Sequence, residues 1–226
     1  TSGSGEGPVD LTWGLIISLV RKIHIEDKFV RQGKWGHFIG QSLYGKTLGI
    51  LGLGHIGKLV SKVGLAFGMN VISWSENLDQ ISAQKYGVTY VDKKTLFSNS
   101  DILSIHTKLS DRTRGLVGEK EISLMKPTSY LINTSRGSII KEQVLIEALN
   151  SHKIAGAGID TFDVEPLSPN HPLLHTPNTL LTPHIGYVTK EAYKAYYEGI
   201  LENVISFLNH NPTRVLNPEV LSKLYG

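Results

Sequence analysis

Short apolar runs alternate with helical patterns along most of this chain, and no other feature of the sequence limits its fold as strongly. The apolar runs have the length of strands and cover residues 47–51, 70–74, 88–91, 102–106, 130–133, 154–159 and 180–181. Amphipathic patterns lie between several of them, most clearly at 55–67 and 141–150. Strands that are apolar on both faces need cover on both faces, which parallel sheets with crossover helices provide. We therefore predict an α/β fold, a doubly wound, Rossmann-type parallel sheet with helices on both faces.

The two ends of the chain differ from this alternating middle. Residues 1–8 are small and polar, which is typical of a linker. Apolar residues then recur at helical spacing over 9–31, and Gly33 is expected to stop that helix. A second amphipathic pattern predicts a final helix over 189–209. No internal repeat is visible, so we expect one domain to account for nearly the whole chain.

Composition excludes several classes of protein. The 226 residues contain no cysteine, which excludes disulfides, thiolate zinc sites and a cysteine nucleophile. The formal net charge is +3 and the basic residues are scattered, so we predict no nucleic-acid partner. The longest apolar stretch, 11–20, is too short to span a bilayer, and no secretory signal is visible. We expect a cytoplasmic protein with no membrane partner.

The sequence GLGHIG at 52–57 matches the G-x-G-x-x-G pattern of a phosphate-binding turn. By itself the match is weak, because the chain contains 23 glycines. An apolar strand before it and a helix after it supply the context that the motif requires. There Gly52 makes the tight turn, Gly54 lets a pyrophosphate approach, and Gly57 lets the helix pack on the strand. The pattern predicts dinucleotide binding; an ordinary glycine-rich turn is the alternative.

The end of the second predicted strand bears on the choice between NAD and NADP. An acidic residue that binds the adenosine ribose is expected about 20 positions after the glycine motif. Here Ser75 stands at the expected position, and the carboxylate is displaced by one, to Glu76. A carboxylate there repels the extra phosphate of NADP, and no Arg or Lys stands nearby to attract it. NAD is therefore the predicted cofactor, with NADP left open.

Three later segments each place a charged or titratable residue just after an apolar strand. They are NTSRG at 133–137, GIDTFDVEP at 158–166 and LTPHIG at 181–186. In an open parallel sheet, the loops at the carboxyl ends of the strands border the ligand crevice. We therefore expect Arg136, Asp160, Glu165 and His184 to converge beside the cofactor.

With these segments, the sequence resembles the D-isomer-specific 2-hydroxyacid dehydrogenase family over almost its full length. The resemblance also includes SIH at 104–106, RTRG at 112–115 and MKP at 125–127, all in their usual order. It implies an oxidoreductase that transfers a hydride between a nicotinamide dinucleotide and a small 2-hydroxy or 2-keto acid, such as glyoxylate or hydroxypyruvate. It also implies a homodimer, with Trp13, Trp35 and the 9–31 helix as candidates for the partner-facing surface.

The resemblance assigns the catalytic roles to Arg136, Glu165 and His184, and a nicotinamide contact to Asp160. Hydride transfer needs these residue types independently of the family: Arg136 matches a carboxylate, and His184 can protonate an alkoxide near neutral pH. Glu165 would favour the imidazolium form of His184. No His, Asp and Glu spacing predicts a metal site. The full set predicted to bind the cofactor is Gly52, Gly54, His55, Ile56, Gly57, Ser75, Glu76, His106, Thr113, Thr134, Ser135, Asp160 and Gly186.

Family members have a second, smaller substrate-binding domain that is supplied mostly by an N-terminal segment. The resemblance therefore predicts residues 1–226 as the dinucleotide-binding domain, with 1–8 as an interdomain linker. It predicts 189–226 as a C-terminal helical segment that returns toward the substrate domain. We expect the N-terminal substrate domain to be absent from this chain and turnover by the chain alone to be poor.

Two functions other than an active dehydrogenase stay open at this point. One is a dinucleotide-sensing binding protein that resembles the family's transcriptional corepressors, since these retain much of the active site. The other is a methyltransferase on a similar sheet, which the glycine pattern and the unused Arg, Glu and His set disfavour. Within the family, Glu165 argues against the formate dehydrogenase branch, where an amide stands at that position.

Overall fold

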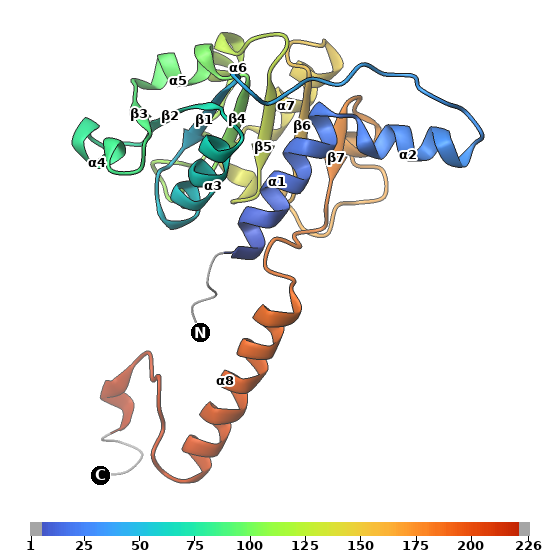
Figure 1. Ribbon diagram of the computed structural model, residues 1–226. Coiled ribbons are helices and arrows are strands. Elements are labelled where there is room, and N and C mark those ends of the chain that lie inside the picture. Colours follow the sequence, from blue (N-terminus) through green and yellow to red (C-terminus); the bar gives the residue numbers. More distant parts are fainter. Residues whose placement is uncertain (1–5, 222–226) are drawn as a thin grey trace.

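The structure is a computed structural model that describes residues 6–221. Its centre is a seven-stranded sheet in which all neighbouring strands are parallel (Figure 1). The strands are β1 (Thr47–Leu51), β2 (Asn70–Trp74), β3 (Thr89–Tyr90), β4 (Ile102–Ile105), β5 (Tyr130–Asn133), β6 (Gly156–Ile159) and β7 (Thr179–Leu181). Their order is β3-β2-β1-β4-β5-β6-β7, so the chain winds outward from β1 in both directions. This order confirms the predicted doubly wound, Rossmann-type fold.

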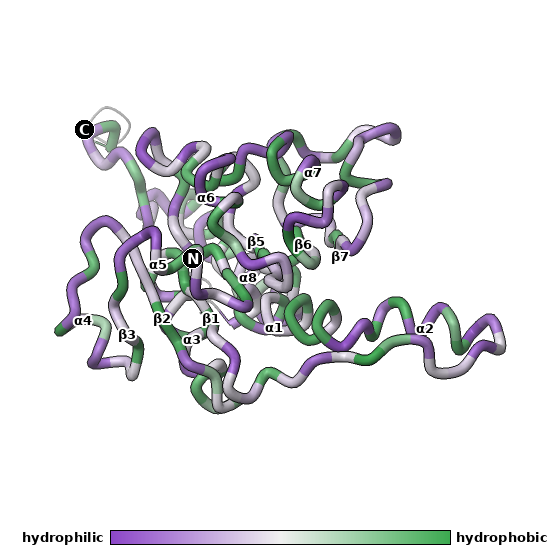
Figure 2. The backbone as a smooth tube through the Cα atoms, turned by 90° about the horizontal axis from the view of Figure 1, so that it is seen from above, coloured by the Kyte–Doolittle hydropathy of each residue, from purple (hydrophilic) through white to green (hydrophobic). Residues whose placement is uncertain are grey.

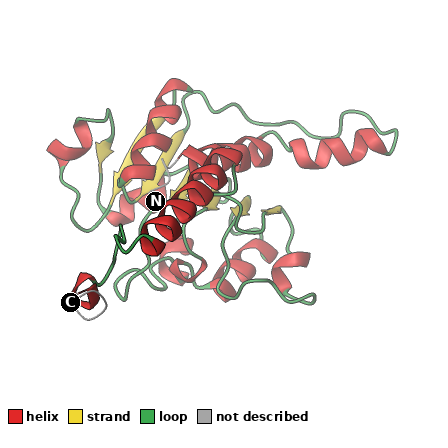
Figure 3. Ribbon diagram, turned by 90° about the horizontal axis from the view of Figure 1, so that it is seen from below, coloured by secondary structure: helices red, strands yellow, loops and turns green. Residues whose placement is uncertain are grey.

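Helices cover both faces of the sheet (Figure 3). Helix α1 (Glu6–Val20) packs on α3 (His55–Ala66) over one face, and α5 (Lys93–Asn99) packs on α6 (Glu119–Leu124) over the other, beside α7 (Glu142–Asn150). Successive strand residues point to opposite faces, so Leu48 and Ile50 of β1 enter one apolar core and Leu51 enters the other. The short helix α4 (Gln80–Gln84) lies beside the edge strand β3.

The predicted single helix over 9–31 is wrong. The chain forms α1 and a separate helix, α2 (Ile23–Arg31), which are divided at Lys22 with a left-handed φ of 56°. Helix α1 buries an apolar face, whereas no residue of α2 is buried. Residues 23–39, here called the α2 arm, leave the body of the protein where the buried face ends (Figure 2). Spacing alone predicts helix on both sides of this break but not the change of direction.

The two tryptophans expected to face a partner lie in different environments. Trp13 is 6% exposed and packs on Phe67, with 5.0 Å between ring centroids, so it belongs to the core and not to a partner surface. Trp35 is 85% exposed on the α2 arm. The expectation for Trp13 is therefore wrong, whereas Trp35 stays accessible.

The described chain begins with a helix and carries a long helix near its C-terminal end. Residues 6–8 of the predicted linker form the first turn of α1, where Pro8 needs no hydrogen-bonded N–H, and 1–5 lie outside the described residues. Helix α8 (Lys190–Leu208) begins after Thr189, whose Oγ1 accepts a hydrogen bond from the Ala192 N–H at 3.1 Å. It projects away from the sheet (Figure 1), and Gly199 is its one buried residue. Residues 222–226 of the predicted C-terminal segment lie outside the described residues. Within 6–221, no helix has the length and apolar character needed to cross a bilayer.

Candidate active site

A crevice of about 1020 Å³ runs along the carboxyl ends of β1, β2, β4 and β5. It opens between β1 and β4 because the chain winds away from these neighbouring strands in opposite directions. Most residues predicted to bind the cofactor line it: Gly52, Gly54, His55, Ile56, Ser75, Glu76, His106, Thr113, Thr134 and Ser135. Gly57, Asp160 and Gly186 do not line it.

The glycine turn between β1 and α3 has the shape that a bound pyrophosphate requires. Gly52 has φ of 100°, and a Cβ there would lie 2.8 Å from the Thr107 backbone nitrogen. A Cβ at Gly57 would lie 2.2 Å from the Gly52 oxygen, so helix and turn pack without side chains between them. Gly54 has no heavy atom within 4 Å of its Cβ position and leaves space in front of the first amides of α3. The turn therefore fits a dinucleotide phosphate.

His106 follows β4 in the middle of the crevice. Its Nε2 lies 2.8 Å from the Ser104 Oγ, and burial lowers the pKa of the imidazole to about 4. The ring is therefore neutral at physiological pH and adds no positive charge to the crevice. Glu76, in contrast, is exposed at the end of β2 and gives the adjoining wall a negative charge.

The loop after β5 presents Arg136 to the same crevice. Asn133 is fully buried, and its side chain accepts a hydrogen bond from the Ser135 N–H and donates one to the Arg136 carbonyl, at 3.0 and 2.9 Å. The Ser135 hydroxyl also donates to the Thr107 carbonyl at 2.5 Å. These contacts fix the backbone of the loop. The Arg136 guanidinium donates from Nη1 to the Ser135 carbonyl at 2.7 Å, and it is exposed at the crevice, where its other N–H groups can reach a ligand.

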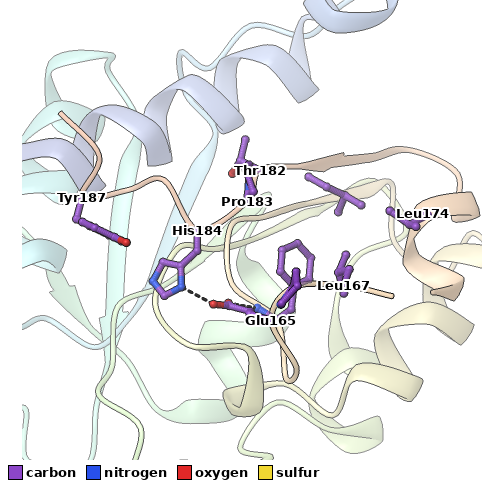
Figure 4. A pocket seen from close by; sticks show the side chains of 10 residues that line it. Glu165, Leu167, Leu174, Thr182, Pro183, His184 and Tyr187 are labelled. Atoms are coloured by element: carbon purple, nitrogen blue, oxygen red, sulfur yellow. Dashed lines mark hydrogen bonds and ion pairs between the residues drawn. The ribbon is translucent and has the colours of Figure 1, made fainter. Parts of the chain in front are cut away.

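Glu165 and His184 meet from two different loops (Figure 4). The Nδ1 of His184 lies 2.7 Å from Oε2 of Glu165, and Oε1 of Glu165 accepts the Phe162 N–H at 2.9 Å. Burial raises the pKa of Glu165, but the hydrogen bonds from His184 and Phe162 and the charges of His184 and Arg136 outweigh it and hold that pKa below its usual value. Because the ionised carboxylate only accepts, the shared proton lies on Nδ1, and Nε2 is left for a ligand.

An apolar pocket of about 520 Å³ adjoins this pair. Its apolar walls come from Phe162, Pro166, Leu167, Leu174, Leu181 and Pro183. Tyr187 lies beside His184, edge-on at 84° with 5.7 Å between ring centroids, and was not singled out by the sequence analysis (Figure 4). Its place three residues after His184 is the one signal that the sequence offers.

Asp160 is 1% exposed and holds the chain around His184. Its Oδ1 accepts hydrogen bonds from the Thr182 hydroxyl and the Ile185 N–H, at 2.6 and 2.9 Å. Its Oδ2 accepts the Gly186 N–H at 3.0 Å. The contact of Asp160 with a nicotinamide stays a prediction. The hydrogen-bond partners of the Asp160 carboxylate all belong to the segment that carries His184.

The remaining acidic and imidazole groups form no metal centre among residues 6–221. His171 pairs with Glu142 instead, with 3.0 Å between Nε2 and Oε1. This second histidine–carboxylate pair joins the loop after β6 to the start of α7 and does not line the crevice.

Comparison with known proteins supports the fold and the family. Residues 13–186 match the family described as D-isomer specific 2-hydroxyacid dehydrogenase, NAD binding domain. A glyoxylate reductase from Aeropyrum pernix is 40% identical over 226 residues, which cover 96% of this chain and 68% of that protein.

Two solved structures show which cofactors accompany this fold. A D-lactate dehydrogenase from Aquifex aeolicus complexed with NAD and lactic acid has a TM-score of 0.82 and 28% identity, covering 92% of this chain and 68% of that one. An acyclic imino acid reductase in complex with NADPH and D-Arg has a TM-score of 0.80 and 31% identity, and the match covers 94% of this chain and 68% of that one. The predicted nicotinamide cofactor and the predicted class of oxidoreductase are confirmed at this level. The chain belongs to the D-isomer-specific 2-hydroxyacid dehydrogenase family and contains its NAD-binding domain.

Proposed function

We propose that this protein reduces a small 2-keto acid to the 2-hydroxy acid, and catalyses the reverse oxidation, with His184 as the acid and base. The observation that carries the proposal is the 2.7 Å contact between His184 Nδ1 and Glu165 Oε2 beside a dinucleotide crevice. Because relatives include glyoxylate reductase, glyoxylate and hydroxypyruvate are the first substrates to test.

In this mechanism the bound reduced nicotinamide supplies the hydride that forms the new C–H bond at C2. His184 transfers the proton on Nε2 to the carbonyl oxygen, which becomes the hydroxyl group. Arg136 binds the substrate carboxylate and the adjacent oxygen with its planar fork, and it keeps its charge throughout. Glu165 holds the proton on Nδ1 and stabilises the imidazolium from which the transfer begins.

We also propose that Glu76 selects NAD over NADP. Its exposed carboxylate lies on the crevice wall at the end of β2, where the ribose of the adenosine half is expected. A second negative charge, from a 2′-phosphate, would be repelled there. His55 and Ile56 would offer amides to the pyrophosphate, and Thr113, Thr134 and Ser135 also line the crevice.

The apolar surface of α8 supports a second proposal, that this helix packs on a substrate-binding domain. Side chains along the helix are exposed by 40% or more: Tyr193, Tyr197, Ile200, Leu201, Val204, Ile205, Phe207 and Leu208. So large an apolar surface is typical of an interface. In protein that carries both domains, Leu201→Ser with Ile205→Ser should lower both turnover and the melting temperature. An unchanged melting temperature would contradict this packing.

The α2 arm supports a third proposal, a homodimer. Several of its apolar side chains are also exposed, including Ile39 at 100% and Trp35 at 85%. Sedimentation should therefore give the mass of two chains, and Ile39→Glu should shift the protein toward the mass of one chain.

We further propose that the protein is located in the cytoplasm, where the reaction would find its nicotinamide cofactor. Cell fractionation tests this location.

The central experiment has two steps. Purified protein is titrated with NADH and NADPH by nicotinamide fluorescence, and protein carrying both domains is then assayed with glyoxylate and hydroxypyruvate. Tighter NADH binding followed by turnover supports the proposal and the role of Glu76. Binding without turnover of any 2-keto acid would favour the dinucleotide-sensing alternative, and absence of binding would contradict the assignment of the crevice.

A further inference from the structure

The segment 182–186, which carries His184, is tied to the sheet through one buried carboxylate. All three hydrogen bonds that Asp160 accepts come from this segment. Two are donated by backbone N–H groups, of Ile185 and Gly186, and one by a side chain, the Thr182 hydroxyl. The side-chain bond is the shortest of the three, at 2.6 Å.

The backbone at His184 needs support from both sides. Its φ of 54° lies in the left-handed region, which residues with a Cβ rarely adopt unless the surrounding contacts hold them there. Its N–H donates to the Thr182 carbonyl at 3.0 Å, and the Thr182 N–H donates to the Ile159 carbonyl at 3.0 Å. Thr182 therefore holds the chain on the N-terminal side of His184. Asp160 links Thr182 to the Ile185 and Gly186 N–H groups, which hold the chain on the C-terminal side.

We propose that Thr182 is a positioning residue for His184. Through its hydroxyl bond to Asp160 it would hold the segment at the distance from which the imidazole reaches both Glu165 and the substrate. This inference rests on the proposed acid/base role of His184. Thr182 lines the apolar pocket beside His184 and not the dinucleotide crevice, so its effect should fall mainly on the chemical step and only weakly on cofactor affinity.

The test replaces Thr182 by Val, which keeps the shape and removes the donor, and by Ser, which keeps the donor. Both variants are made in protein that carries both domains, and kcat and KM for a 2-keto acid are measured with saturating NADH. We expect Thr182→Val to lower kcat about 10- to 100-fold with KM and NADH affinity nearly unchanged, because small misplacements of a catalytic group are costly. Thr182→Ser should restore most of kcat.

Amide hydrogen exchange gives a second reading that does not depend on activity. We expect faster exchange at Ile185 and Gly186 in Thr182→Val and wild-type exchange in Thr182→Ser. If Val fails to fold, Thr182→Ala removes the hydroxyl without adding a methyl group against Asp160 and takes its place.

The outcomes separate this inference from the proposed function. Wild-type protein that reduces no 2-keto acid would contradict the proposed function, and exchange at Ile185 and Gly186 would then decide whether the Thr182 anchor exists. Wild-type turnover with an unchanged kcat in Thr182→Val would overturn the positioning role. So would a rise in KM at unchanged kcat, or a Ser variant as impaired as the Val variant.

Discussion

The two ends of the crevice are built in different ways. At the glycine turn, the backbone itself is the binding surface, and the residues that shape it are adjacent in the sequence. At the Glu165–His184 pair, side chains do the work, and the partners are 19 residues apart. They meet because β6 and β7 are neighbours, with Ile159 beside Leu181. Changes at the turn should therefore alter binding and stability, whereas changes at the pair should alter turnover alone.

The largest effect is expected from Arg136→Lys, at the catalytic end. Turnover of the 2-keto acid should fall about 10²- to 10³-fold, because a lysine ammonium cannot make the paired contacts of a guanidinium. NADH affinity should change little, since Asn133 fixes the backbone of the loop through two hydrogen bonds, whereas the guanidinium adds one, to the Ser135 carbonyl. The measurements are kcat/KM and the NADH dissociation constant. Lost NADH binding with unchanged turnover per bound enzyme would contradict the assignment.

Glu165→Gln should lower keto-acid reduction by about 10²-fold at alkaline pH, because an amide donor facing Nδ1 favours the wrong tautomer of His184. The shape of the pH–rate profile should also change, because the carboxylate that pairs with His184 Nδ1 is lost. The pKa of Glu165 is held low, so wild-type protein keeps this carboxylate ionised throughout the neutral and mildly acidic range.

Glu142→Gln is the matched control for that variant. It changes the other histidine–carboxylate pair, in which Glu142 lies 3.0 Å from His171 and apart from the crevice. The pH–rate profile should keep its wild-type shape. An unchanged profile in Glu165→Gln would show that Glu165 and His184 are not coupled.

Gly52→Ala should destabilise the protein by about 1–3 kcal/mol and weaken NADH binding, because a Cβ at φ of 100° strains the backbone and meets Thr107. Gly54→Ala is the comparison within the same turn. The space around Gly54 is open, so its methyl group should leave the melting temperature nearly unchanged and weaken NADH binding by obstructing the phosphate. Equal melting temperatures for both variants would contradict the expectation that Gly52 is needed for stability and Gly54 only for binding.

The smallest effect is expected from Glu76→Gln. The carboxylate is exposed, and interactions of exposed charges are weakened by solvent and salt, so the NADH-over-NADPH preference should fall by about 10-fold or less. The preference is measured as the ratio of the NADPH and NADH dissociation constants, at low and at high salt. A preference that stays unchanged at low salt would remove Glu76 from cofactor selection.

Much of the fold could be predicted from local patterns. The bounds of β1, β2 and β5 agree with the apolar runs. β1 and β5 are buried along nearly their whole length, and β2 keeps an apolar pattern although its side chains are buried only in part. The break between α1 and α2 could not be predicted, since α2 continues the helical spacing but buries none of its residues. Tyr187 was missed for a similar reason, because its contact with His184 depends on the turn that follows β7.

By itself, the sequence determined the strand–turn–helix unit at 47–66, the succession of strands along the chain, and the residue types of the site. Each of these depends on neighbours in the chain or on periodicity. The tertiary structure decided which distant residues are in contact: Glu165 with His184, and Asp160 with Thr182. It also decided that α2 leaves the body of the protein. These features depend on which strands are neighbours in the sheet and on where the buried surface of the protein ends. No local sequence pattern reports either, because the residues involved are far apart in the chain.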